Sequence, residues 1–108
     1  MGKPSRDKGA RRERALVQKH RDLGVKCERV PLSGAARYQG NGADLDVYAF
    51  GPDTAPLIFE AKARGNGGGF LTIERWLADN DGLFLWRDRA EPLVVLPWRV
   101  WERFVRKA

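Results

Sequence analysis

Apolar residues recur at helical spacing in three segments of the chain. Residues 9–23 predict a first helix, which ends at Gly24 and carries the stripe Leu16, Val17, His20 and Leu23. Residues 70–78 predict a second helix, and a third follows near the end of the chain. Their stripes are Ile73, Trp76 and Leu77, then Trp98, Trp101, Phe104 and Val105. At this spacing we expect His20 and the aromatic residues to pack in the core, the alternative for the aromatics being stacking on bases.

Five shorter segments predict strands between these helices. Residues 25–30 form the first, and residues 44–50 and 57–63 form a hairpin across a turn rich in glycine and proline. Residues 83–86 and 93–96 are nearly continuous apolar runs, which is typical of buried strands. The order αβββαββα predicts an α/β domain with a central mixed β-sheet flanked by helices.

Length and composition indicate an ordinary globular domain. The chain has 108 residues, of which 43% are hydrophobic and 31% charged. No apolar run approaches the ~18 residues of a membrane span, and no apolar segment follows the basic start, so no secretory signal is expected. Cys27 is the only cysteine, which excludes an internal disulfide and a cysteine-based zinc site. We expect a cytoplasmic location.

The net charge of +6 is concentrated in the first third of the chain. Residues 1–37 hold eleven Lys and Arg against four Asp and Glu, a bias that favours a polyanionic partner, most simply nucleic acid. The alternative is a basic protein without such a partner. Residues 1–7 are predicted to be a mobile basic arm and residues 8–108 a single domain.

The predicted hairpin carries the candidate chemistry. Because strand side chains alternate between faces, Asp44, Asp46 and Tyr48 share one face of the first strand, and Glu60 and Lys62 share one face of the second. Carboxylates that meet across a hairpin suit Mg²⁺, which prefers oxygen ligands. The alternative is that the Glu-x-Lys pair is a solvated surface ion pair.

A turn centred on Asp53 sets the expected register of this hairpin. It places Asp46 opposite Glu60, and Asp44 opposite Lys62. Directly opposed carboxylates repel each other unless a cation or a proton lies between them. We therefore expect Asp46 to bind the metal and Asp44 to position Lys62.

Glu13 is a candidate third acid. It lies three, four and seven residues before Leu16, Val17 and His20, and therefore on the inward stripe of the first helix. An inward carboxylate is costly unless it is paired, hydrogen-bonded or near a metal. The alternative to a metal site is an ion pair with an internal arginine.

Several of these residues together resemble a nuclease superfamily. Residues 8–17 (KGARRERALV), then Ser33-Gly34, Asp46 and Glu60-Ala61-Lys62, are similar to the motifs of the PD-(D/E)xK nucleases. Within that superfamily the chain resembles archaeal-type Holliday-junction resolvases. The resemblance covers residues 8–64 and implies a restriction-endonuclease-like fold and a part in DNA recombination.

The resemblance also implies a metal-dependent DNA endonuclease and a role for each matching residue. Asp46, Glu60 and the backbone carbonyl of Ala61 would hold Mg²⁺, for which Mn²⁺ would substitute, with Glu13 supporting the metal or its water. Lys62 would orient the attacking water or neutralise the phosphate. The expected products carry a 5′-phosphate and a 3′-hydroxyl.

The expected substrate is a four-way junction or another branched DNA. A homodimer is expected, because a C₂ dimer presents two sites to two symmetric strands. The alternatives are a nickase or restriction-like enzyme that cuts duplex or flapped DNA, and a catalytically silent nucleic-acid-binding module. Ser33 is a supporting candidate. The basic residues assigned to DNA contact are Lys3, Arg6, Lys8, Arg11, Arg12, Arg37 and Arg64.

Overall fold

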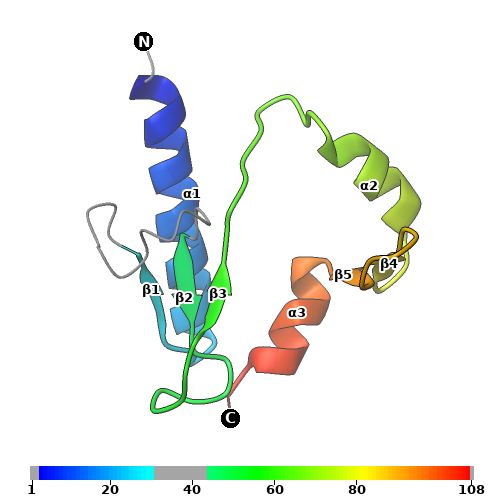
Figure 1. Ribbon diagram of the computed structural model, residues 1–108. Helices are drawn as coiled ribbons and strands as arrows, with labels where there is room; N and C mark the ends of the chain where they lie inside the picture. Colours follow the sequence, from blue (N-terminus) through cyan, green and yellow to red (C-terminus); the bar gives the residue numbers. More distant parts are fainter. Residues whose placement is uncertain (1–2, 31–43, 108) are drawn as a thin grey trace. The chain divides into compact units, whose positions relative to one another are not determined.

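The structure, a computed structural model, describes residues 3–30 and 44–107, with side chains from residue 9 onward (Figure 1). Its helices and strands follow the predicted order αβββαββα, so the α/β class is confirmed. Their bounds, in chain order, are α1 Lys3–Asp22, β1 Cys27–Arg29, β2 Leu45–Val47, β3 Leu57–Phe59, α2 Phe70–Leu77, β4 Leu83–Leu85, β5 Leu93–Val95 and α3 Trp98–Val105.

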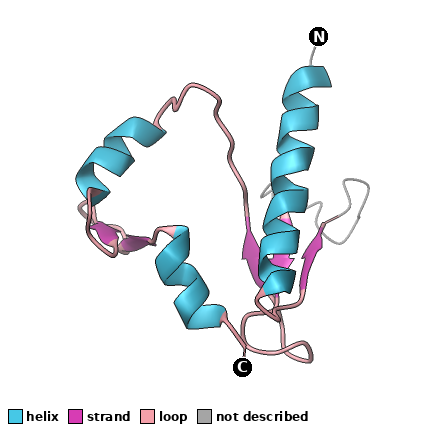
Figure 2. Cartoon of the chain, turned by 180° about the vertical axis from the view of Figure 1, so that it is seen from behind, coloured by secondary structure: helices cyan, strands magenta, loops and turns pink. Residues whose placement is uncertain are grey.

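The chain divides into two compact units, Met1–Ala63 with Val105–Ala108, and Arg64–Phe104. In the first unit, α1 lies along a three-stranded antiparallel sheet with the order β1-β2-β3 (Figures 1 and 2). Helix α1 begins at Lys3 rather than Gly9, and so includes most of the segment assigned to an arm. The separate arm and the single domain stay predictions.

The core of the first unit follows from strand alternation. On β2, Leu45 and Val47 are only 3% and 1% exposed, whereas Asp46 between them is half-buried on the opposite face. Val17 of α1 and Leu23, which directly follows the helix, are both buried and belong to the stripe that the sequence predicts. Each fully buried side chain of this kind contributes about 1.5–3 kcal/mol. The core therefore fixes the side of β2 on which Asp46 lies.

Two residues with titratable side chains are buried in this core. His20 is 4% exposed, and its Nδ1 donates to the carbonyl of Leu16 at 2.7 Å, which confirms it as a packed core histidine. Cys27 is fully buried, and burial raises the pKa of its thiol. A thiol with a raised pKa stays protonated and unreactive at neutral pH.

The C-terminal segment completes the first unit. Val105 is buried, and the amide of Lys107 donates to the carbonyl of Leu23 at 2.9 Å. The Lys107 ammonium donates to the carbonyl of Ala49 at 2.7 Å. Gly24 has a φ of +82°, and a Cβ there would lie 3.2 Å from Cβ of Lys107, so glycine suits both the backbone and the close approach.

The register of the β2–β3 hairpin differs from the prediction by two residues. Asp46 lies opposite Ile58, with Leu45 opposite Phe59 and Val47 opposite Leu57, so the expected pair of Asp46 with Glu60 is wrong. The cause is the turn, which is centred on Pro52 instead of Asp53. Its hydrogen bonds run from the amide of Gly51 to the carbonyl of Tyr48, and from the amide of Thr54 to the carbonyl of Gly51. Gly51 has a φ of +127°, a region that favours glycine.

The second unit contains α2, the antiparallel β4–β5 hairpin and α3 up to Phe104. Arg99 of α3 bonds to Asp81 at 2.8 Å and to the carbonyl of Asn80 at 3.1 Å. The hydrogen bond from Arg99 holds the pKa of the Asp81 carboxyl below its ordinary value. These contacts connect the loop before β4 to the first turn of α3.

Burial in this second unit is lower than predicted. Several side chains expected in the core are more than half exposed, namely Trp76, Phe84, Trp86, Leu93, Val94 and Phe104. A two-stranded hairpin cannot cover both of its own faces, and its unit contains no further strand or facing sheet to do so. The prediction of two buried strands is therefore wrong for this unit.

The strands form two separate antiparallel sheets, β1-β2-β3 and β4-β5, instead of the one mixed sheet predicted. Parallel pairing needs a long crossover between neighbouring strands. In the described part of the chain every pair joins two consecutive strands, and every pair is antiparallel. None of the described helices is long and apolar enough to cross a membrane.

Candidate active site

Asp44 is fixed immediately before β2 by hydrogen bonds to both neighbouring strands. Its amide donates to the carbonyl of Phe59 at 2.9 Å, and its carbonyl accepts from the amide of Val30 at 2.8 Å. Its carboxylate oxygen Oδ2 accepts from the amide of Ala61 at 2.8 Å. The other oxygen, Oδ1, bonds to none of the described residues. The carboxylate is thus held in place by the backbone of Ala61.

Glu60 and Lys62 flank the amide that holds Asp44, just after the end of β3. Nζ of Lys62 forms an ion pair with Oε2 of Glu60, and the two side chains are 58% and 39% exposed. An ion pair with this exposure contributes only about 0–1 kcal/mol to stability, so it does not account for the fold. The residues on either side of the amide that Asp44 accepts from thus carry one carboxylate and one ammonium, which are paired with each other.

Asp46 occupies another position on the sheet. It lies opposite Glu28 of β1 and Ile58 of β3. Directly opposed carboxylates are destabilising in a sheet, and here the opposed acid is Glu28 and not Glu60. The register therefore removes the argument that favoured Asp46 over Asp44 as the metal ligand. Both assignments stay predictions.

Glu13 forms an ion pair with Arg29, with Oε1 and Nε 3.0 Å apart. The sequence left an ion pair with an arginine as the alternative to a metal site; this arginine is 37% exposed instead of internal, and the Glu13 side chain is 20% exposed. Arg29 lies opposite Leu45, the residue after Asp44. The ion pair thus connects α1 to the sheet one position away from Asp44.

The described residues include no group of three or more His, Cys, Asp or Glu side chains placed to hold one metal ion. The predicted acids Glu13, Asp46 and Glu60 are therefore not gathered into one cluster. Mg²⁺, however, is commonly bound through one or two carboxylates and keeps several waters. Asp44 and Glu60, with the adjacent backbone carbonyls, fit that requirement.

The residues assigned to DNA contact are distributed over both units. Arg11 and Arg12 are exposed on α1, and Arg64 is exposed at the start of the second unit. The side chains of Lys3, Arg6 and Lys8 lie outside the described part, although their backbone is helical. Ser33 and Arg37 lie outside the described residues altogether.

Two contacts of this site were not predicted from the sequence. A signal for Arg29 was present, because it follows Cys27 by two residues and strand alternation puts both on the side of α1. The contact between the Ala61 amide and Asp44 has no such signal, because it depends on the hairpin register.

A helix over three antiparallel strands, with an aspartate beside a Glu-x-Lys sequence, fits a nuclease of the PD-(D/E)xK class, to which the family model assigns the chain. The family model for the archaeal Holliday junction resolvase (Hjc) matches residues 4–100. The chain belongs to this Hjc family, and hence to the DNA-binding nucleases of recombination. Comparison with curated proteins and with solved structures finds no match.

Proposed function

We propose that the chain is a divalent-metal-dependent endonuclease that cuts four-way DNA junctions. The observation that carries the proposal is the hydrogen bond from the Ala61 amide to Asp44, which puts a fixed carboxylate beside Glu60 and Lys62. Membership of the Hjc family supports the same chemistry and substrate class.

In this proposal, Asp44 and Glu60 hold Mg²⁺ together with the carbonyl of Ala61, and Mn²⁺ substitutes for it. Such an ion lowers the pKa of a bound water and stabilises the charge that develops on the phosphate. The Ala61 amide fixes the Asp44 carboxylate beside Glu60, where it would serve as a ligand of the ion. Asp46 takes the supporting role, because its cross-strand neighbours are Glu28 and Ile58.

Lys62 provides the positive charge that the reaction needs near the scissile phosphate. Its ammonium has three donors, and the ion pair with Glu60 requires only one of them. The remaining donors can orient the attacking water or bind a phosphate oxygen. Glu13, held by Arg29, supports the metal or its water from α1.

The substrate and the oligomeric state follow from the same proposal. A four-way junction has two symmetric strands to cut, and a C₂ homodimer presents two equivalent sites to them. Ser33 and the basic residues of α1 contribute to the DNA contact. The net charge of +6 favours a polyanionic substrate of this kind.

A panel of matched DNA substrates tests this function. Four-way junction, duplex, flap and single-stranded DNA of the same sequence are incubated with the protein and Mg²⁺, and the cleavage rates are compared. We expect the junction to be cut fastest. Equal cutting of duplex or flap would assign the protein to the nickase or restriction-like alternative. Binding without cutting of any substrate would make it a silent binding module.

The affinity for DNA should fall steeply with salt concentration. Each phosphate neutralised by the protein contributes about −0.9 to the slope of log K against log salt concentration. Deletion of residues 1–7 removes Lys3 and Arg6 and should flatten the slope by roughly one to two units. Fluorescence anisotropy at several salt concentrations measures both slopes. An affinity that does not change with salt would contradict the assignment of DNA as the partner.

A further inference from the structure

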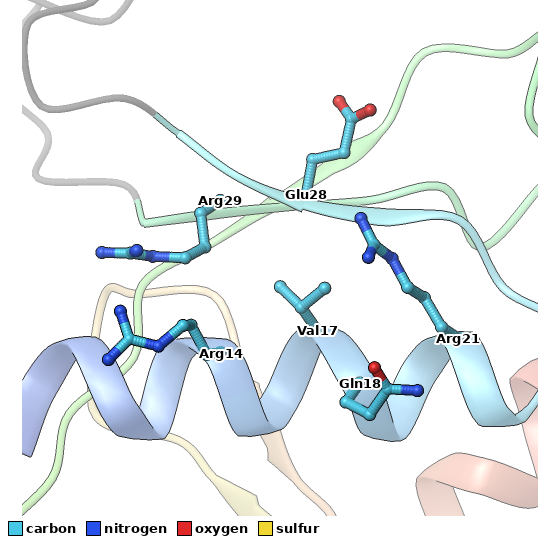
Figure 3. Close-up of a pocket in the computed structure, with 6 residues that line it drawn as sticks. All are labelled: Arg14, Val17, Gln18, Arg21, Glu28 and Arg29. Carbon is cyan, nitrogen blue, oxygen red and sulfur yellow. The ribbon is translucent and has the colours of Figure 1, made fainter.

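The loop of residues 64–69, at the start of the second unit, carries a reactive pair of residues that the candidate site does not use. It is separate from the hollow between α1 and β1, which lies in the first unit and is lined by Arg29 of that site (Figure 3). Within the loop, Asn66 precedes Gly67. An Asn-Gly pair is the sequence in which an asparagine side chain most readily cyclises onto the backbone amide that follows it. The local structure decides whether this pair can react.

The side-chain carbonyl of Asn66 is exposed to solvent and polarised by the loop. Its Oδ1 accepts a hydrogen bond from the amide of Gly68 at 3.1 Å. This bond withdraws electrons from Cγ, and it stabilises the negative charge that develops on Oδ1 when a nucleophile attacks, as an oxyanion hole does. The carbon atom that must be attacked is therefore activated.

The nucleophile is the backbone nitrogen of Gly67, and the structure protects it only weakly. Its hydrogen bond to the carbonyl of Arg64 is 3.4 Å long, beyond the roughly 2.7–3.2 Å of ordinary N–H···O bonds. Gly67 has no side chain to shield this nitrogen, and its φ is +76°, a conformation that favours glycine. It also lies outside the helices and strands, so no regular pattern of backbone hydrogen bonds has to break before the nitrogen reaches Cγ of Asn66.

We propose that Asn66 is a self-modification site, at which deamidation turns the side-chain amide into a carboxylate without an enzyme. The Gly67 nitrogen attacks Cγ of Asn66, and a C–N bond forms. The bond from Cγ to Nδ2 breaks, and ammonia leaves with the proton that the Gly67 nitrogen has lost. Water then opens the resulting cyclic succinimide at either carbonyl, which gives aspartate or isoaspartate. No oxidant or reductant takes part.

The new carboxylate lies in the same turn as a residue assigned to DNA contact. Asn66 follows Arg64 by two residues, and the Gly67 amide closes the turn onto the Arg64 carbonyl. A negative charge there repels phosphate and competes with DNA for the Arg64 guanidinium group. Deamidation therefore weakens DNA binding, a consequence that rests on the proposed function, whereas the reaction itself does not.

Asn80, in the same unit, provides an internal reference. The residue after it is Asp81, whose side chain shields the nitrogen that would attack and is itself bonded to Arg99 at 2.8 Å. The carbonyl of Asn80 accepts from the same guanidinium group at 3.1 Å. These two contacts hold the backbone on both sides of the reacting group and oppose the rotation that cyclisation requires. Asn80 should therefore stay unmodified.

Peptide mapping by mass spectrometry, after incubation of the full chain in mildly alkaline buffer, tests the reaction. Trypsin cuts after lysine and arginine, so the three asparagines fall in separate peptides, Asn41 in 38–62, Asn66 in 65–75 and Asn80 in 76–87. We expect peptide 65–75 to gain the mass of an –NH₂ group replaced by –OH, partly as isoaspartate, and peptide 76–87 to stay unchanged. Asn66→Gln, whose longer side chain cyclises far more slowly, should abolish the mass change in peptide 65–75.

The same chain in denaturant gives the rate of the unprotected pair. The rate in the folded chain should lie within about tenfold of it, because a loop outside helices and strands opens at little cost in free energy. Peptide 65–75 that stays unmodified in the folded chain, while it reacts in denaturant, would show that the loop protects Asn66 and would overturn the proposal. Equal rates for Asn66 and Asn80 in the folded chain would also overturn it.

Asn66→Asp tests the effect on DNA, because it carries the charge of the product and keeps the oxygen that accepts from Gly68. Its affinity for junction DNA, measured by anisotropy in EDTA, should fall about two- to fivefold, the effect of one exposed charge. Asn80→Asp adds the same charge to another exposed loop of the unit and should keep a higher affinity. Equal affinities of the two variants would overturn the effect on DNA. Junction cleavage by the unmodified wild-type chain is scored separately, so this failure is distinguishable from failure of the proposed function.

Discussion

Asp44→Asn should reduce the rate of junction cleavage by about 10²-fold or more and weaken Mg²⁺ binding, whereas Asp46→Asn should keep most of both. Asp44 lies beside Glu60 and Lys62 because its Oδ2 accepts from the Ala61 amide. An asparagine can still accept that hydrogen bond through its amide oxygen, so the variant should fold. It removes the negative charge that a hard cation requires.

Mg²⁺ affinity by calorimetry and single-turnover cleavage rates test this prediction. Asp53→Asn is the matched control, since Asp53 is exposed in the turn between β2 and β3. It should behave as wild type. If Asp46→Asn loses metal binding and Asp44→Asn retains it, Asp46 is the ligand and the role proposed for Asp44 is wrong.

Glu60→Gln and Lys62→Ala should each abolish cleavage while leaving junction binding largely intact. Loss of a metal ligand or of a group that stabilises developing charge costs roughly 10²–10³-fold in rate. Stability should change little, because the two side chains are 39% and 58% exposed and their ion pair contributes only about 0–1 kcal/mol.

Single-turnover cleavage at saturating protein and anisotropy in EDTA separate the two effects. Glu91→Gln, at an exposed position between β4 and β5, controls for the loss of one carboxylate. Cleavage by Lys62→Ala at the wild-type rate would mean that Glu60 and Lys62 are only a surface ion pair. Loss of binding together with cleavage would assign them to DNA affinity instead of chemistry.

The local features of the fold could be predicted from the sequence. Alternation in Leu45-Asp46-Val47 predicted the strand and its buried face, and the apolar stripe of residues 16–23 predicted Val17, His20 and Leu23 as core residues. These signals are local, because the side chain's own position in a helix or strand decides which way it faces.

Features that depend on tertiary contacts could not be predicted in the same way. The hairpin segment contains Gly51, Pro52 and Pro56, which allow more than one turn centre, and a shift of one residue there moved the register by two. Because of that shift, Asp44 instead of Asp46 lies beside Glu60. The apolar stripe of the first helix also predicted that Glu13 faces inward. It did not predict whether the carboxylate would pair with Arg29 or bind a metal.

The apolar runs at 83–86 and 93–96 show that burial, too, could not be predicted from the local sequence. Their composition predicted strands correctly, but it predicted burial that the hairpin lacks, with Phe84 76% exposed. Burial depends on whether a second layer covers the strand, and the strand's own sequence does not specify that layer.

The central claim is that Asp44, Glu60 and Lys62 form a metal-dependent centre for cutting DNA junctions. Its most direct test is single-turnover cleavage of an end-labelled four-way junction by the wild-type chain, with Mg²⁺ and with EDTA. The account predicts cleavage in Mg²⁺ that is lost in EDTA and restored by added Mg²⁺, with 5′-phosphate and 3′-hydroxyl ends. Cleavage at the same rate in EDTA, or no cleavage in Mg²⁺ by a folded protein that binds the junction, would contradict it.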